Sequence, residues 1–183
     1  SGAVDRESGR GILAFTRVSG KTVVTRACAH SPLRFLQPRT RGEAAWVYTT
    51  TYGGGLVGGD ALALDVEVGA GAAALLTTQA SSKVYRSARP CAQDLTARVG
   101  ADGVLLIAPD PLVCFAGAVL SQRQTIELQP SASLLPASRV LMVPSGMRIS
   151  PNHTCSSRAG TPSRRATAKS CRKCSCCRTA AIR

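Results

Sequence analysis

Short β-type segments, separated by glycine and small polar residues, fill the first 130 or so residues of this 183-residue chain. The clearest of them is Ala61 to Val68, in which Leu62, Leu64, Val66 and Val68 share one face while Asp65 and Glu67 lie on the other. We find no amphipathic pattern long enough for a helix of ten or more residues. Many short strands at this spacing predict an all-β fold built of layered sheets.

The turns between these segments can be placed from residue type. Ser19-Gly20 predicts a hairpin, whereas Gly69-Ala70-Gly71 and Ala101-Asp102-Gly103 predict turns. Strands are expected at residues 12–18, 22–28, 44–52, 61–68, 73–81, 94–99, 104–108, 112–120 and 124–128. No internal sequence repeat is evident, so the sequence alone does not predict a regular solenoid.

The chain changes character near residue 128. Its formal net charge is +13, but all ten acidic residues precede this point together with thirteen Lys and Arg, which leaves +3 there and +10 beyond. After Val143 the large aliphatic or thioether side chains are Met147, Ile149 and Ile182. Such a segment buries too little apolar surface to offset its ordering entropy. We therefore expect a β domain over residues 1–144 and a disordered Cys-, Arg- and Ser-rich tail over residues 145–183.

Five glycines lie within seven residues, in the segment Gly53-Gly54-Gly55-Leu56-Val57-Gly58-Gly59-Asp60. Glycine is costly to order and is kept where the chain needs positive φ or close approach of another backbone. These glycines predict tight turns between strands, with a functional surface loop as the alternative. A phosphate loop is not supported, because the Gly-Lys-Ser/Thr ending is missing. Asp60 would cap the turn or offer a carboxylate to a passing divalent ion.

A second motif follows, Thr77-Thr78-Gln79-Ala80-Ser81-Ser82-Lys83-Val84-Tyr85-Arg86-Ser87. The two motifs together resemble the urease accessory proteins of the UreD (UreH) family, whose members carry GGGLVxGD followed by TTQAxxKVYRS. Further matches at residues 31–34, 45–48, 109–111 and 114–116 extend the resemblance over roughly Gly11 to Leu128. The resemblance implies a stacked, β-helix-like fold. It also implies that this chain is incomplete, because family members are considerably longer.

The resemblance implies a role as a scaffold and metal-delivery chaperone in the cytoplasm, not as an enzyme. Proteins of this family bind UreF, which recruits the GTPase UreG, and the assembly inserts nickel into apo-urease. GTP would be bound by the partner, and nickel would be cargo in transit, with no cofactor bound tightly. By resemblance, Thr77, Thr78 and Ser82 would line a nickel conduit, with Lys83 and Arg86 at its mouth. The structural alternative is a strand that leaves the core with its hydroxyls bonded to neighbouring backbone.

Metal-binding residue types are few. Nickel favours imidazole, carboxylate or thiolate ligands, and the chain has two histidines, His30 and His153, so we expect no strong fixed site. Transient ligation by scattered carboxylates would suit a conduit, although each also fits a solvated or turn position: Asp60, Asp65, Glu67 and Asp110. The tail sequence Cys171-x-x-Cys174-x-Cys176-Cys177 does not have the spacing of a structural zinc site.

The remaining features describe the setting. Cys28, Cys91 and Cys114 are widely spaced, which predicts reduced, buried thiols in a cytosolic protein. No run approaches the ~18 apolar residues of a membrane span, there is no secretory signal, and the missing initiator Met suggests a fragment or processed chain. We find no nucleophile elbow or Ser-His-Asp arrangement, so no enzyme is predicted.

Two alternatives remain open. One is a small basic β-sheet protein that binds nucleic acid, although the basic tail lacks interleaved aromatic residues and would bind only nonspecifically. The other is a nonfunctional truncated remnant of the family. A shifted reading frame or an alternative exon would produce such a tail.

Overall fold

The computed structural model describes residues 8–136, 140–142, 148–157 and 166–167. The chain in these ranges forms β-strands and one short 3-10 turn, η1 (Tyr52–Gly54), without an α-helix. The predicted all-β fold is therefore confirmed. No helix in this part of the chain is long and apolar enough to cross a membrane.

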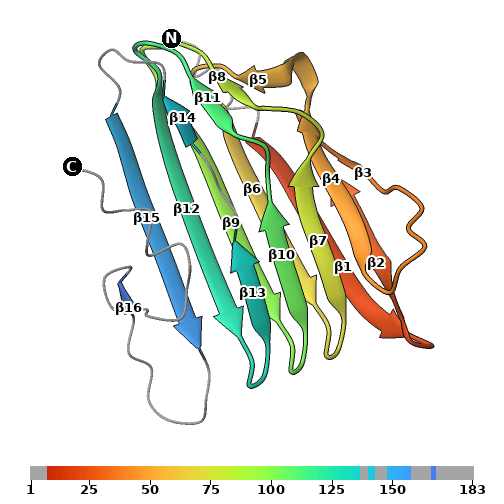
Figure 1. The fold of residues 1–183 in the computed structure, drawn as a ribbon. Coiled ribbons are helices and arrows are strands. Elements are labelled where there is room, and N and C mark those ends of the chain that lie inside the picture. Colours follow the sequence, from red (N-terminus) through yellow and green to blue (C-terminus); the bar gives the residue numbers. More distant parts are fainter. Residues whose placement is uncertain (1–7, 137–139, 143–147, 158–165, 168–183) are drawn as a thin grey trace.

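The strands form three sheets; in Figure 1 the short strands of sheet C lie at the top, and the longer strands of sheets A and B overlap in the view below them. Sheet A has the order β16 (Ala166–Thr167), β15 (Arg148–Ser157), β12 (Val119–Leu128), β9 (Cys91–Val99), β6 (Ala61–Val68), β1 (Ser8–Val18), β2 (Lys21–Ala29). Sheet B has the order β13 (Ser133–Pro136), β10 (Val104–Ala108), β7 (Ala73–Thr78), β4 (Ala45–Thr51), β3 (Leu33–Leu36). Sheet C has the order β14 (Val140–Met142), β11 (Leu112–Cys114), β8 (Lys83–Val84), β5 (Gly55–Leu56).

The chain visits the sheets in the order B, C, A and then repeats. We call β4-β5-β6 coil 1, β7-β8-β9 coil 2, β10-β11-β12 coil 3 and β13-β14-β15 coil 4. Equivalent strands of successive coils pair in parallel, so that Ala45 aligns with Ala74, Ala74 with Leu105, and Leu105 with Leu134. The same parallel pairing joins the coils in sheets A and C. The fold is thus a β-helix with coils of roughly 30 residues.

Each passage from one coil to the next, which leads from sheet A to sheet B, uses the same tight turn. Its third residue has positive φ, 63° at Gly71, 56° at Asp102 and 64° at Ser131. The next residue donates its N–H to the first, from Ala72 to Gly69 at 3.1 Å and from Gly103 to Gly100 at 3.0 Å. The repeat therefore exists in the backbone conformation but not in the sequence, because the residue with positive φ is a different type in each turn.

The N-terminal strands close one end of the β-helix. β1 pairs with β2 as the predicted hairpin, in which Ser19 and Gly20 have φ of 48° and 83°. β1 also pairs in parallel with β6, and β3 pairs antiparallel with β4. These pairs place β2 and β3 at the open edges of sheets A and B.

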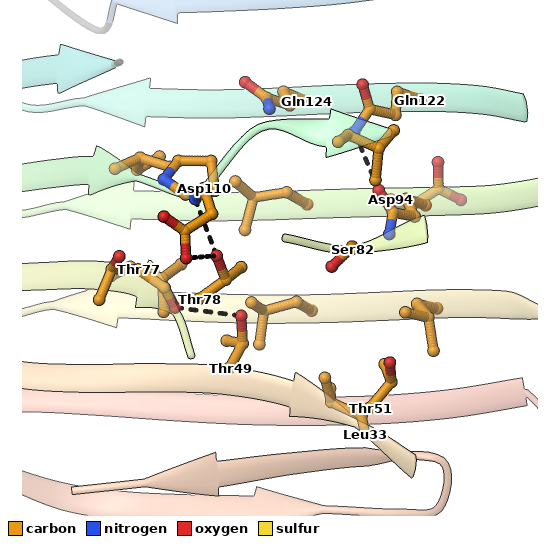
Figure 2. Close-up of a pocket in the computed structure, with 18 of the residues that line it drawn as sticks. Leu33, Thr49, Thr51, Thr77, Thr78, Ser82, Asp94, Asp110, Gln122 and Gln124 are labelled. Atoms are coloured by element: carbon orange, nitrogen blue, oxygen red, sulfur yellow. Dashed lines mark hydrogen bonds between the residues drawn. The ribbon is translucent and has the colours of Figure 1, made fainter. Parts of the chain in front are cut away.

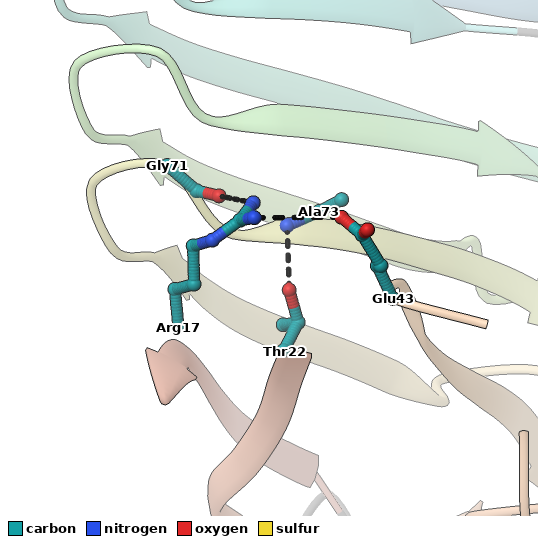
Figure 3. Close-up of polar contacts among 5 residues, drawn as sticks. All are labelled: Arg17, Thr22, Glu43, Gly71 and Ala73. Atoms are coloured by element: carbon teal, nitrogen blue, oxygen red, sulfur yellow. Dashed lines mark hydrogen bonds and ion pairs between the residues drawn. The ribbon is translucent and has the colours of Figure 1, made fainter. Parts of the chain in front are cut away.

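Polar contacts fasten the hairpin to coil 2 (Figure 3). The buried Thr22 accepts a hydrogen bond from the N–H of Ala73 at 2.9 Å, and Arg17 donates to the carbonyl of Gly71 at 3.0 Å. Arg17 also lies 3.4 Å from Glu43, but both side chains are exposed, so this ion pair contributes little. The hydrogen bond to Thr22 is the stronger constraint. Without it, the N–H of Ala73 at the start of β7 would be left without an acceptor beside the core, which is costly.

Two apolar clusters fill the interior. The larger lies between sheets A and B and includes Leu13, Phe15, Val47 and Leu105. The smaller lies beneath sheet C, and it contains Leu56, Val84, Cys91, Leu112, Cys114, Ala118 and Leu120. The alternation predicted for 61–68 is seen, since Val66 and Val68 are buried while Glu67 is exposed.

Some expectations differ from the structure. Residues 112–120, expected as one strand, are β11, a turn with Gly117 at φ 76°, and the start of β12, because the chain turns there from sheet C to sheet A. Cys91 and Cys114 are buried as predicted, but Cys28 is exposed because it lies in the outer half of edge strand β2. All three thiols are free.

The predicted tail is described in part. Strands β15 and β16 fall within residues 145–183, where we expected disorder. Residues 158–165 and 168–183, including the cysteine cluster from Cys171, lie outside the described residues. The division at residue 144 stays a prediction.

Core packing between coils can be tested with Leu105→Ala. Leu105 is fully buried, so its truncation should lower the free energy of unfolding by about 3 kcal/mol through lost burial and cavity formation. The matched control is Leu135→Ala, because Leu135 is 53% exposed on neighbouring strand β13. Urea denaturation followed by circular dichroism measures both; equal effects would contradict the stacked core.

Candidate functional site

The two sequence motifs pack against each other. Gly53, Gly54 and Gly59 have positive φ of 78°, 67° and 93°, which glycine adopts without strain. Gly55 and Gly58 leave room for the second motif. A Cβ at Gly55 would lie 2.7 Å from both the carbonyl oxygen of Lys83 and Cε2 of Tyr85.

The contact continues along the loop. A Cβ at Gly58 would overlap the side chain of Ser87, and one at Gly59 would lie 3.2 Å from Cζ of Arg89. The glycine block thus forms a set of turns, and residues 83–89 pack directly against it. The spacing between the motifs equals one coil, since Gly55 pairs with Lys83 and Leu56 with Val84.

Asp60 closes the glycine block. Its Oδ2 accepts a hydrogen bond from the N–H of Val57 at 2.8 Å, and its own N–H donates to the carbonyl of Val57 at 3.0 Å. This is the turn-capping arrangement expected as one of its two roles. Its predicted role as a transient metal ligand stays a prediction.

A pocket of about 170 Å³ lies inside the β-helix, between the strand ends of sheet B and the middle of sheet A (Figure 2). Its lining comes from β3 and coils 1 to 3: Leu33, Thr49, Thr50, Thr51, Leu62, Leu64, Leu76, Thr77, Thr78, Ser82, Gln93, Asp94, Leu95, Ile107, Pro109, Asp110, Leu112, Gln122, Arg123 and Gln124. Because coils stack at about 4.8 Å, this lining runs along the β-helix axis.

Polar groups follow the pocket from coil to coil. Thr49 donates to the carbonyl of Thr77 at 3.2 Å, and Thr77 donates to the carbonyl of Ala108 at 2.7 Å. Thr78 accepts the N–H of Asp110 at 2.8 Å and donates to its carboxylate at 3.3 Å (Figure 2). The hydroxyls are thus bonded to neighbouring groups, as the structural alternative requires, and they line a pocket as well.

The predicted conduit residues divide into two groups. Thr77, Thr78 and Ser82 line the pocket, whereas Lys83 and Arg86 are not among its lining residues. Val84 points into the core, so alternation along the segment turns Lys83 outward, where it is exposed. Whether any of these residues serves a conduit is a prediction that the geometry leaves open.

Sequence reasoning missed the glutamines of sheet A. Gln93 and Gln122 line the pocket and bond to each other, with 2.9 Å between Nε2 of Gln122 and Oε1 of Gln93. The available signal was alternation, because Gln93 shares its strand face with Leu95 and Ala97. A polar residue on an otherwise apolar face indicates a polar group inside the fold.

The carboxylates suggested as transient ligands lie apart. Asp110 lines the pocket, whereas Asp65 lies on the outer face of sheet A with its Oδ2 3.4 Å from Nη2 of Arg10, and the exposed Asp94 shares that outer face. Within the described ranges no group of three or more His, Cys, Asp or Glu side chains is placed to hold a metal ion. The side chain of His153 lies outside what the structure describes.

Both of these motifs lie within the part of the chain that matches the sequence model of a protein family. Residues 7–141 match the sequence model described as UreD urease accessory protein. The chain belongs to the UreD family.

Individual UreD relatives agree. The chain is 54% identical over 129 residues to "Urease accessory protein UreD" of Sorangium cellulosum, covering 70% of this chain and 41% of the relative. It is 47% identical over 133 residues to the protein of that name from Anaeromyxobacter, covering 72% and 45%. It is 41% identical over 131 residues to "Urease accessory protein D" of Oryza sativa subsp. indica, covering 68% and 43%. The match thus spans less than half the length of these UreD relatives.

Gly58→Ala tests the interlock of the two motifs. The added methyl group would overlap the side chain of Ser87, so we expect a loss of about 1–3 kcal/mol in the free energy of unfolding. Ser87→Gly in the same chain should restore part of the loss. Gly42→Ala is the control, because a Cβ there meets nothing within 4 Å. Absence of coupling in a double-mutant cycle of Gly58→Ala with Ser87→Gly would contradict the interlock.

The buried thiols predict a pH dependence. Burial, together with the Asp60 carboxylate, raises the pKa of Cys91, and burial with the neighbouring Cys91 raises the pKa of Cys114. Unfolded thiols titrate near pH ~8.5, so the unfolded state loses protons first and the stability from these groups falls as pH rises through the folded pKa. As the pH rises through the alkaline range, the free energy of unfolding of the native chain should fall more steeply than that of a Cys91→Ala/Cys114→Ala variant. Urea denaturation at each pH measures both. Parallel curves would contradict this.

Proposed function

We propose that this chain acts in urease maturation as a nickel-delivery scaffold, working in the cytoplasm with UreF, the GTPase UreG and apo-urease. Its membership of the UreD family supports the accessory role, and the relatives it matches are named urease accessory proteins. The observation that carries the proposal for this chain is the pocket along the β-helix axis, whose largely apolar lining also presents hydroxyl, amide and carboxylate groups.

The chemistry of the pocket suits a cation in transit. Its hydroxyl, amide and carboxylate oxygens are weak ligands for nickel compared with imidazole or thiolate. The Asp110 carboxylate lies beside the Thr78 hydroxyl, and Thr49 and Gln122 supply further neutral oxygens to the lining. Such a lining attracts a divalent cation and also allows its release, so we assign the pocket to the path that nickel takes through the protein.

A second candidate is a remnant that does not support urease activation. The match spans 41% of the Sorangium cellulosum relative and 45% of the Anaeromyxobacter relative, so much of the surface available to a full-length UreD protein is not represented in the match. Co-expression with cognate UreF, UreG and apo-urease separates the two candidates. The scaffold proposal expects copurification and nickel-dependent urease activity; neither would be seen for a remnant.

Thr78→Leu tests the pocket itself. It replaces the hydroxyl beside Asp110 with an apolar group of larger volume, so nickel-dependent urease activation should fall several-fold while copurification persists. Thr25→Leu is the matched control, since Thr25 is exposed on β2 away from the pocket. Circular dichroism checks that both variants fold. Unchanged activation by the folded Thr78→Leu chain would remove the pocket from the proposal.

A further inference from the structure

An exposed apolar stripe crosses three coils on the outer face of sheet C. Leu56, Val84 and Cys114 are buried at equivalent positions of successive coils, so alternation turns the following residues outward. These are Val57, Tyr85 and Phe115, exposed by 56%, 39% and 37%. We call these three residues the sheet C stripe.

The stripe is held in place by stacking and by the glycine block. The rings of Tyr85 and Phe115 stack with centroids 5.4 Å apart and planes 16° apart. The ring of Tyr85 also lies against Gly55, where a Cβ would approach Cε2 to 2.7 Å. Two large apolar side chains are thus fixed at the surface by their surroundings, which lowers the entropy cost of binding to them.

Three cationic side chains flank the stripe: Lys83, Arg86 and Arg89. Lys83 precedes Tyr85 by two residues and shares its outward direction. A Cβ at Gly117 would lie 3.1 Å from Cγ of Arg86, which places Arg86 beside the coil of Phe115. A Cβ at Gly59 would lie 3.2 Å from Cζ of Arg89, which places Arg89 beside the coil of Val57.

Within the part of the chain that the structure describes, these three cations form no ion pair. Among the described residues, ion pairs join Arg10 to Asp65, Arg17 to Glu43 and Arg98 to Glu127, and none includes Lys83, Arg86 or Arg89. The neighbouring carboxylate, Asp60, is engaged by the N–H of Val57. An exposed apolar stripe beside uncompensated positive charge is complementary to an apolar, acidic surface.

We propose that the sheet C stripe, with Lys83, Arg86 and Arg89, docks an acidic segment of a partner protein that also carries apolar side chains. The apolar side chains cover Val57, Tyr85 and Phe115, while carboxylates pair with the three cations. Single-stranded nucleic acid fits less well, because the two rings stack on each other and have fewer free faces for bases. The site is separate from the pocket, since none of its six residues lines it, and it does not rest on the proposed function.

The probe is a fluorescein-labelled peptide of Glu-Glu-Leu repeats, titrated with the full chain and followed by fluorescence anisotropy. Arg86→Glu/Arg89→Glu should weaken binding at least about 10-fold, and Tyr85→Ala/Phe115→Ala should weaken it about 10-fold, as expected for central contacts of an interface. Tyr85→Phe/Phe115→Tyr conserves the stack and should bind within about twofold of the native chain.

Matched controls separate this site from general charge. Lys21→Glu/Arg26→Glu makes the same charge change at exposed positions of β2, and Trp46→Ala removes an aromatic ring that is 42% exposed on sheet B. Both controls should leave binding unchanged, and circular dichroism verifies folding of every variant. Equal weakening by Lys21→Glu/Arg26→Glu, or no effect of Tyr85→Ala/Phe115→Ala, would overturn the proposal. Tighter binding of labelled oligo-dT, lost in the Arg86→Glu/Arg89→Glu chain, would assign the surface to nucleic acid instead.

Discussion

The parallel hydrogen bonding between successive coils is the constraint on which the rest of this molecule depends. It fixes equivalent residues of different coils above one another, as with Ala74 and Leu105 in sheet B or Leu56 and Val84 in sheet C. The apolar clusters, the lining of the pocket and the sheet C stripe are all built from residues stacked in this way. A slip of one residue in one coil would turn its inward side chains outward and would disrupt all of them together.

The same constraint gives the two family motifs a physical meaning. They lie one coil apart, so stacking places the glycine block directly beside residues 83–89. Glycine at positions 55, 58 and 59 then makes room for Tyr85, Ser87 and Arg89. The motifs therefore form one structural unit, whose inner side borders the smaller apolar cluster and whose outer side carries the sheet C stripe.

Much of the fold could be predicted from the sequence, because alternation is local. The strand over Ala61–Val68 and that over Val104–Ala108 were predicted with their exact bounds, and the Ser19-Gly20 hairpin was predicted with its turn. The regular solenoid could not be predicted from the residues. Gly71, Asp102 and Ser131 adopt one backbone conformation with three residue types, and strands as short as Gly55–Leu56 carry too few residues to show a pattern. The site could be predicted only in part. Thr77, Thr78 and Ser82 were chosen through family resemblance, and the structure places them in the lining of the pocket. Lys83 and Arg86 are not among the lining residues, and their predicted place at the mouth of a conduit stays a prediction. Gln93 and Gln122 were missed because both lie just outside the strands expected at 94–99, 112–120 and 124–128, so the alternation that includes them was not used.

The register of the coils is the most direct test of this account. In a uniformly ¹⁵N,¹³C-labelled chain, nuclear Overhauser contacts between backbone protons report which strands are neighbours. The stacked β-helix predicts contacts between Leu76 and Ile107, and between Val68 and Val99, with parallel patterns wherever strands of successive coils pair in sheets A and B. Antiparallel contacts between Ala61–Val68 and Ala73–Thr78 across the Gly69-Ala70-Gly71 turn would show an ordinary hairpin there and would contradict the account.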